Sequence, residues 1–293
     1  MKDTLAIVVT YNRLPLLKEN LCALFKINTQ ADILVINNHS DDGTNDYLQK
    51  SNFDFITLEK NIGGAGGFYI GIKEAVTRGY KYAWIMDDDT IPYPDSLACL
   101  LEAANFLQNS FGFLCSYVEW IDGNACIMNK PELISPENNL EDEYVKKGII
   151  RCKRASFVSM LLKTDTVKKA GLPIKEFFIW GDDVEYSNRI AQSDRCYFVS
   201  NSCVLHKMKS NNPTNIISDN PERLSRYKYL YRNQTYMARK KGPKASILNT
   251  GYIFYQILKI LGTKTNQKWK RIHIVLSGWN KGLHFNPNIE YIK

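Results

Sequence analysis

Residues 82–90 read YAWIMDDDT, an apolar run typical of a buried strand that ends in three successive aspartates. Three adjacent carboxylates repel one another, so packing alone does not explain them. Two oxygen ligands on alternate residues, Asp87 and Asp89, suit a hard divalent cation such as Mg²⁺ or Mn²⁺. An acidic turn that caps the next helix is the alternative. We favour a strand with a metal site at its carboxyl end.

The chain before this segment alternates between strand-like and helix-like patterns. Short apolar, β-branched runs predict buried strands at residues 5–10, 33–37 and 53–57. The stretches between them predict helices over residues 14–24, from residue 41, and up to about residue 77. This alternation predicts an α/β fold, in which a mostly parallel sheet is flanked by helices. Ligands of such sheets bind beyond the carboxyl ends of the strands, where the aspartates lie.

The rest of the 293-residue chain is less regular. We expect helices over residues 97–107 and 245–261, strands over 112–120 and 156–162, and a polar loop over 131–147. The net charge is distributed unevenly along the chain: residues 222–293 carry a net charge of +13, and residues 1–221 carry −5. We therefore expect a main domain over residues 1–221, with halves of about 1–95 and 96–221, followed by a basic, aromatic helical region over 222–293.

A glycine-rich segment, NIGGAGGF, occupies residues 61–68. Backbone N–H groups of such a loop can approach a phosphate or a sugar closely. The segment is neither a Walker A loop nor a dinucleotide fingerprint, since no Gly-Lys-Ser/Thr follows and the first strand does not precede it. A tight structural turn is the alternative. Because the three aspartates follow one strand later, we favour a nucleotide site over a structural turn for the glycine segment.

Residues 178–186, FIWGDDVEY, place two further carboxylates after an aromatic run. Asp182 or Asp183 can supply a general base, and a helix cap with acids in its first turn is the alternative. His206 follows the strand-like residues before it and would complete an O,O,N metal set with Asp87 and Asp89.

Composition excludes several classes of protein. With 44% hydrophobic and 23% charged residues, the chain is globular rather than disordered or fibrous. Seven cysteines without a CxxC pair argue against a disulfide framework or a zinc ribbon. No run of 18 apolar residues exists, and the N-terminal apolar run is too short for a signal peptide. We expect a cytoplasmic protein.

These motifs, in this order over about residues 5–235, resemble glycosyltransferase family 2. The resemblance rests on TYNR at residues 10–13, NNHSDDGT at 37–44, the glycine segment, the Asp87–Asp89 triple and WGDD at 180–183. The glycine segment and WGDD are most similar to bacterial galactofuranosyltransferases. The resemblance implies a GT-A (Rossmann-like) fold and an inverting, metal-dependent glycosyltransferase, a hexosyltransferase of EC 2.4.

The resemblance also implies roles for residues on the donor side. Asp87, Asp89 and His206 would bind Mn²⁺ or Mg²⁺, while Asp88 would reach the donor ribose or sugar. The other residues assigned to the nucleotide-sugar donor are Thr10, Asn12, Arg13, Asn38, Asn61, Gly63, Gly64, Gly66 and Gly67. Asn38 stands where many relatives have an aspartate for the uracil, which leaves the base specificity open.

On the acceptor side, the resemblance makes Asp183 the general base and Asp182 a ligand of the acceptor hydroxyl. Trp180 would form a wall of the acceptor site, and Glu185 would also contact the acceptor. The chemistry fits these residue types, because a carboxylate must remove the hydroxyl proton while a cation and Arg13 neutralise the departing diphosphate.

The C-terminal region predicts contact with a membrane. Cations and tyrosines alternate over residues 226–233, and an apolar helical stripe over 253–261 precedes four basic residues. Such a helix can lie on anionic lipid at the inner face of the cell membrane, which suits a lipid-linked glycan acceptor. A helix that packs on the main domain is the alternative.

The donor that we favour is UDP-galactofuranose, for synthesis of a bacterial cell-surface polysaccharide. dTDP-rhamnose or another UDP-hexose is the next choice. From other classes, we keep a nucleotidyltransferase and a non-catalytic nucleic-acid- or sugar-binding protein as alternatives. We expect no nucleic-acid partner, because no recognised nucleic-acid motif is present.

Overall fold

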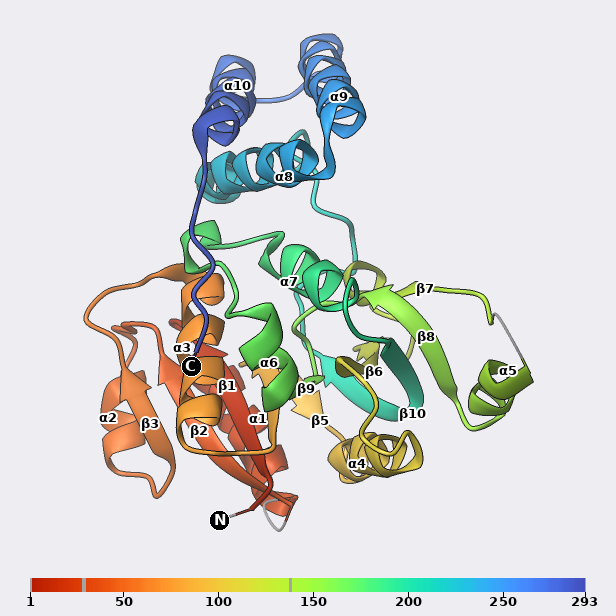
Figure 1. Cartoon of the computed structure of the whole chain (residues 1–293). Coiled ribbons are helices and arrows are strands. Elements are labelled where there is room, and N and C mark those ends of the chain that lie inside the picture. Colours follow the sequence, from red (N-terminus) through yellow and green to blue (C-terminus); the bar gives the residue numbers. More distant parts are fainter. Residues whose placement is uncertain (1, 28–29, 137–138, 293) are drawn as a thin grey trace.

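The computed structural model describes residues 2–27, 30–136 and 139–292. Its centre is a ten-stranded sheet in the order β3-β2-β1-β4-β9-β6-β10-β8-β7, with β5 paired to β10 (Figure 1). Helices cover both faces of the sheet, and three further helices stand at one end. This arrangement confirms the α/β fold expected from the sequence.

The N-terminal half of the sheet is parallel. Its strands are β1 (Thr4–Thr10), β2 (Ala31–Asn37), β3 (Asp54–Thr57) and β4 (Tyr82–Asp87). The helices between them are α1 (Leu14–Lys26), α2 (Thr44–Gln49) and α3 (Gly63–Thr77). These are the βαβ units predicted from the alternating patterns, and they align the ends of β1 and β4.

The other half makes the sheet mixed rather than mostly parallel. β9 (Met160–Lys163) runs antiparallel between β4 and β6 (Phe113–Trp120). The remaining strands are β10 (Cys196–His206), β8 (Ile149–Arg154), β7 (Glu132–Leu133) and β5 (Thr90–Pro92). Among the strand pairs formed by the described residues of this half, only β10 and β6 are parallel. Apolar patterning gives a strand its faces but not its direction, so the sequence did not predict this reversal.

Two local expectations from the sequence were wrong. β9 begins at Met160 rather than at residue 156, because Ser159 adopts a φ of 55° that breaks the extended backbone. Residues 131–147 are more than a loop, since they contain β7 and α5 (Asn139–Lys146).

The remaining elements of this half are α4 (Ser96–Phe106), α6 (Thr164–Ala170), α7 (Asp182–Ile190) and the 3₁₀ turns η1 (Ile127–Asn129), η2 (Lys175–Phe177) and η3 (Pro221–Arg226).

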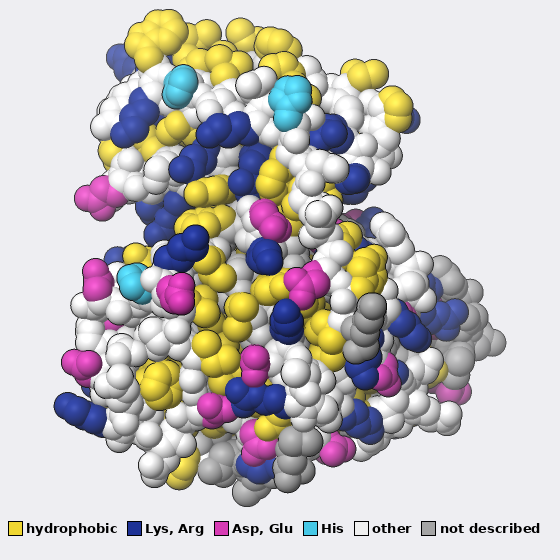
Figure 2. All heavy atoms as spheres, turned by 60° about the vertical axis from the view of Figure 1, so that its left-hand side comes forward, with side chains coloured by type: hydrophobic (Ala, Val, Ile, Leu, Met, Phe, Trp, Pro, Cys, Tyr) yellow, Lys and Arg dark blue, Asp and Glu magenta, His cyan; other side chains and the backbone are white. Residues whose placement is uncertain are grey.

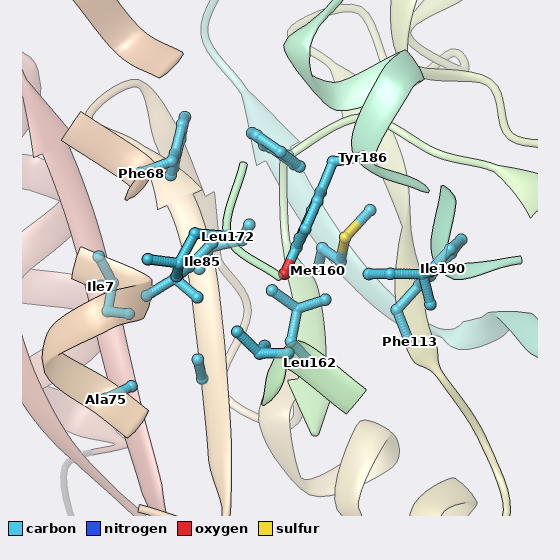
Figure 3. Close-up of a cluster of buried hydrophobic side chains, with 14 of the residues drawn as sticks. Ile7, Phe68, Ala75, Ile85, Phe113, Met160, Leu162, Leu172, Tyr186 and Ile190 are labelled. Carbon is cyan, nitrogen blue, oxygen red and sulfur yellow. The ribbon is translucent and has the colours of Figure 1, made fainter. Parts of the chain in front are cut away.

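The sheet has a separate hydrophobic core on each face. Residues of β1 alternate between them: Ile7 belongs to the cluster that includes residues of α3 and α7, whereas Val8 belongs to the cluster that includes residues of α1 and α4. Figure 3 shows the first core, in which Ile7, Phe68 and Ile85 lie on one side and Tyr186 and Ile190 of α7 on the other. The shared core ties the helix that begins at Asp182 to the parallel half of the sheet.

Three helices follow the sheet: α8 (Tyr227–Lys241), α9 (Pro243–Gly262) and α10 (Lys268–His284). They pack around their own apolar cluster, which includes Tyr231, Ile253, Ile260 and Val275. The chain after α10 then returns along α3 (Figure 1), where Lys73 and Tyr69 bind the Glu290 carboxylate. Of the helices in the described ranges, none has both the length and the hydropathy needed to cross a membrane.

Candidate functional site

The fold brings Asp87, Asp89 and His206 together. Asp87 ends β4, Asp89 lies in the turn that follows, and His206 ends β10. β5 continues from this turn and pairs with β10, with Thr90 opposite His206. Ligand atoms of the three residues lie within 4.8 Å of one another. Two carboxylates and one imidazole form a donor set that fits Mn²⁺ or Mg²⁺.

A fourth residue, Asn129, orients the histidine. The Nδ1 of His206 donates to Oδ1 of Asn129 at 2.9 Å, and its Nε2 lies 3.0 Å from Oδ1 of Asp89. Asn129 is held in turn by Ser156, to which its amide donates at 2.9 Å. Such outer partners fix the tautomer and the ring orientation of metal-binding histidines. The sequence carried no signal for Asn129, because it lies outside every motif.

Asp88 does not belong to this set of ligand atoms and is held by the end of β1. Its carboxylate accepts hydrogen bonds from Thr10 Oγ1 at 2.8 Å and from the backbone of Tyr11 at 3.4 Å. Arg13 lies 3.5 Å from Asp88 and also pairs with Asp89. Asp88 therefore ties the TYNR segment to the aspartate triple, and Arg13 places a cation beside the three ligands.

Charges and burial shift the pKa values of these groups strongly. Burial, together with the charge of Asp89, raises the pKa of Asp87 to about 6, and burial raises that of Asp88 to about 7. Burial would also raise the pKa of Asp89, but the hydrogen bond and charge of His206 outweigh it and lower this pKa to about 2. For His206, burial opposes the charged form, yet Asp89 raises its pKa to about 10. Asp89 thus stabilises positive charge beside it, here on His206.

Further cations stand near Arg13. Burial and the charges of Arg223 and Arg13 lower the pKa of Arg226, which lies where η3 meets α8. Arginines that disfavour one another in this way are stabilised when an anion comes between them. In the sequence, Arg223 and Arg226 are recognisable only as part of the basic region that begins at residue 222.

The remaining donor-side residues assigned from the sequence, Asn12, Asn38 and Asn61, make local backbone contacts. Asn12 Oδ1 accepts from the Asp41 backbone at 2.8 Å. The amide of Asn38 joins the start of α3, accepting from Ile62 N and donating to Gly63 O, both at 2.9 Å. Asn61 Oδ1 accepts from Gly63 N at 2.8 Å. All three shape the loops around the cluster.

The four glycines belong to the first turns of α3. Gly63 has a φ of +77°, and a Cβ there would lie 2.0 Å from the carbonyl oxygen of Phe178. Gly66 and Gly67 are buried, and a Cβ on either would meet a side chain within 2.5 Å. Close packing therefore accounts for these three glycines without a ligand. Gly64 differs, because a Cβ there would meet no heavy atom within 4 Å.

Asp182 and Asp183 begin α7, directly after Gly181 at a φ of 89°. Asp183 Oδ1 accepts from the Val184 backbone at 2.7 Å. Burial raises the pKa of both carboxyls, that of Asp182 to about 8 with the charge of Asp183 adding to the effect. The charge of Asp183 also raises the pKa of Asp87, so the two acidic motifs lie within electrostatic reach of one another.

The other two predicted acceptor-side residues have structural partners. The ring of Trp180 packs edge-on against the ring of Tyr227 of α8, with 5.1 Å between the ring centroids. Both oxygens of Glu185 accept from Arg189 at 2.9 Å. This ion pair within α7 accounts for Glu185 without an acceptor.

The model of the family described as Glycosyl transferase family 2 matches residues 5–152, half of the chain. Among curated proteins, Galactofuranosyltransferase GlfT1 of Mycolicibacterium smegmatis is 25% identical over 205 residues, which cover 64% of this chain and 65% of that protein. GlfT1 of Mycobacterium tuberculosis is 23% identical over 215 residues, 66% of each chain. The matched region thus spans slightly less than two thirds of these relatives.

Solved structures share the fold. GalNAc-T7, crystallised with UDP, GalNAc and Mn²⁺, superposes with a TM-score of 0.58 at 15% identity, over 81% of this chain and 50% of that one. Residues 1–349 of S. aureus TarS in complex with UDP-GlcNAc give a TM-score of 0.54 at 16% identity, over 98% and 74% of the two chains. Both support the GT-A fold expected from the sequence.

Proposed function

This chain belongs to glycosyltransferase family 2, and on that premise we propose that it transfers a sugar from a UDP-linked donor to a glycan or lipid-linked glycan acceptor. The observation that carries the proposal is the cluster of Asp87, Asp89 and His206 at the strand ends, with Arg13 beside it. Both structural neighbours named above were solved with UDP or a UDP-sugar, which supports a UDP donor.

The donor binds beyond the ends of β1 and β4 in this proposal. Asp87, Asp89 and His206 would hold Mn²⁺ or Mg²⁺, which supplies charge neutralisation for the diphosphate. Arg13 and Arg226 add positive charge on the side of the sheet edge where the diphosphate would bind. Gly64 leaves room for the donor at the start of α3, and Thr10 keeps Asp88 in place.

The transfer step requires a base on the acceptor side, and Asp183 takes this role. Its carboxylate accepts the proton of the acceptor hydroxyl while that oxygen attacks the anomeric carbon of the donor. The bond from this carbon to the diphosphate breaks, and UDP leaves with the electron pair. A single in-line displacement inverts the anomeric configuration. Asp182, whose raised pKa keeps it protonated at neutral pH, can donate a hydrogen bond to the acceptor.

Galactofuranose is the transferred sugar that we propose, within synthesis of a bacterial cell-surface polysaccharide. The support is the similarity to GlfT1 at 25% and 23% identity together with the glycine segment and WGDD.

We also propose that residues 222–293 touch an anionic lipid surface. Large apolar side chains of α9 face solvent, and Leu248 and Leu258 are each 67% exposed. Figure 2 shows hydrophobic side chains gathered at this end of the molecule and Lys and Arg side chains between them and the sheet. Apolar residues flanked by cations suit a membrane interface. Leu248→Glu with Leu258→Glu should abolish co-sedimentation with anionic vesicles, and unchanged sedimentation would contradict the contact.

The transfer proposal is tested by calorimetric titration of UDP with and without Mn²⁺, followed by transfer assays with candidate donors. We expect micromolar binding that needs the metal, and turnover of UDP-galactofuranose. Binding of dTDP in place of UDP would move the donor to rhamnose. If neither nucleotide binds, the proposal is wrong.

A further inference from the structure

A cavity of about 450 Å³ lies outside the metal cluster, between α8, α9 and the chain that joins β10 to η3. Residues 212–216 and Ser218 form one wall, Tyr227 and Tyr231 of α8 form another, and Tyr252 and Gln256 of α9 form a third. The volume falls in the range of small-ligand sites.

The lining combines aromatic rings with neutral hydrogen-bonding groups. Asn212, Asn215 and Gln256 contribute amides, and Thr214 and Ser218 contribute hydroxyls. Neutral amides and hydroxyls match the many hydroxyl groups of a sugar, and the rings can pack on its apolar faces. The cavity has one cation in its lining, Lys259, and no carboxylate among the described residues. This chemistry fits an uncharged glycan better than a phosphate or a metal ion.

Tyr231 of α8 adds a further hydroxyl-bearing residue to the lining of the cavity. Tyr231 is 2% exposed, and its hydroxyl makes no hydrogen bond to any residue in the described ranges. Burial and the nearby Tyr252 raise its pKa, and no hydrogen bond contributes. The hydroxyl of Tyr231 is not one of the fully buried atoms left without a partner in the described residues, so water can reach it. A hydroxyl that water reaches inside a cavity can exchange that water for a hydroxyl of a ligand. Tyr231 is therefore suited to bind a hydroxyl inside the cavity.

The wall of the cavity is held in place from behind. Arg271 of α10 is only 1% exposed and donates to the backbone carbonyl oxygens of Ile216 and, at 3.3 Å, of Asp219. Thr265 donates to Ile217 O at 2.8 Å. A buried arginine that uses its donors on loop carbonyls orders the loop strongly, since leaving them unpaired would be costly. The cavity is thus a preformed feature of the fold.

The cavity adjoins the acceptor side of the proposed active site. Tyr227 lines it, and the ring of Tyr227 packs against Trp180, two residues before Asp182. Its wall also begins six residues after His206. A glycan in the cavity would extend past Trp180 toward Asp183.

We infer that this cavity binds the part of the acceptor glycan remote from the reacting hydroxyl. The inference rests on the proposed function and deepens it, because it assigns a second binding region to the acceptor. It makes the length of the acceptor matter, since only an acceptor of several sugars can fill the cavity and reach Asp183 at the same time.

The experiment compares two tyrosines of α9. Tyr252 lines the cavity and is 43% exposed, whereas Tyr255 is 55% exposed and is not among the lining residues. Tyr252→Ala should raise KM at least tenfold for a galactofuranosyl tetrasaccharide, with little effect for a monosaccharide acceptor or for the donor. Tyr255→Ala should leave all three KM values within twofold. Equal effects of the two substitutions, or no effect of either, would overturn the inference.

A second variant and a direct binding measurement make the test independent of turnover. Gln256→Met keeps the size of the side chain and removes its amide, so it should weaken binding of the same tetrasaccharide in saturation-transfer NMR. If the wild-type protein binds the tetrasaccharide and both variants bind it more weakly, but nothing is transferred, the proposed function fails and the cavity assignment stands. If the wild type transfers sugar but Tyr252→Ala and Gln256→Met bind the tetrasaccharide normally, the cavity assignment fails alone.

Discussion

The side-chain amide of Asn233 donates a 2.8 Å hydrogen bond to the carbonyl oxygen of Trp180. The same nitrogen lies 3.0 and 3.2 Å from the carbonyl oxygens of Phe177 and Ile179. Asn233 is fully buried, and Trp180 has a φ of 64°, a conformation that a bulky residue rarely adopts. A residue of α8 thus holds the strained turn that leads into Asp182.

Asn233→Asp should separate catalysis from donor binding. The new carboxylate keeps the shape but replaces the donor with an acceptor, so the turn shifts and the carboxyls that follow lose their position. We expect kcat to fall about 100-fold, a loss typical of a displacement of about 1 Å, with UDP affinity in Mn²⁺ unchanged. Asn249→Asp in α9, where the amide bonds Thr235 at 3.1 Å, is the control. If UDP affinity falls as much as kcat does, Asn233 acts on the fold as a whole.

Asp183→Asn removes the proposed base while keeping its size. We expect transfer to fall by about 10²- to 10⁴-fold, the contribution of a positioned general base, and UDP affinity to stay within a few-fold. Rates at saturating donor and acceptor, with calorimetry of UDP, measure the two effects. Asp165→Asn, at an exposed site in α6, serves as the control. If UDP binding disappears instead, Asp183 shapes the donor site.

His206→Ala should weaken Mn²⁺ activation, and Asn129→Ala should do so to a smaller degree. Asn129 does not belong to the ligand set, but it fixes the ring that does, and loss of such a partner typically costs about 10- to 100-fold in metal affinity. Titration of Mn²⁺ by calorimetry or by activity gives the affinity. Asn124→Ala, in the nearby turn, is the control. An unchanged Mn²⁺ titration for His206→Ala would remove the histidine from the ligand set.

The reaction should lose activity as the pH falls. Burial raises the pKa of Asp183, while the charge of Arg154 and backbone hydrogen bonds oppose this. Asp183 must be ionised to accept a proton, so kcat is highest above its pKa and declines below it. We expect the acid limb above pH ~4, the ordinary range of an aspartate. UDP affinity is followed over the same range. An acid limb that tracks UDP affinity would belong to the donor site rather than to the base.

Two adjacent glycines of α3 should respond oppositely to alanine. Gly63→Ala puts a Cβ against the Phe178 backbone at a positive φ, which should destabilise the protein by at least about 2 kcal/mol. Gly64→Ala meets open space in a helix and should stabilise by about 0.5–1 kcal/mol. Urea unfolding of both variants measures the difference. If Gly63→Ala is as stable as the wild type, the contact with Phe178 does not hold α3 in place.

The sequence by itself determined the parallel half of the sheet and the residues that meet at its edge. Apolar runs and helical spacing are local properties, and parallel βαβ units necessarily bring their strand ends to one edge. Asp87 and Asp89 were therefore found from the sequence. His206 was inferred because its residue type completes the donor set that a divalent cation prefers.

Only the tertiary structure decided how these residues are supported. Asn129 reaches His206 across 77 residues and Asn233 reaches Trp180 across 53, and no local pattern records such contacts. Packing against neighbouring elements likewise showed that Gly66 and Gly67 are required by the fold. The antiparallel course of β9 and the cavity beside α9 depend on the path of the whole chain. The direction of a strand, the packing of a side chain and the pairing of distant residues depend on the free energy of the whole folded chain. The periodicity of a segment shows only which of its own faces is apolar.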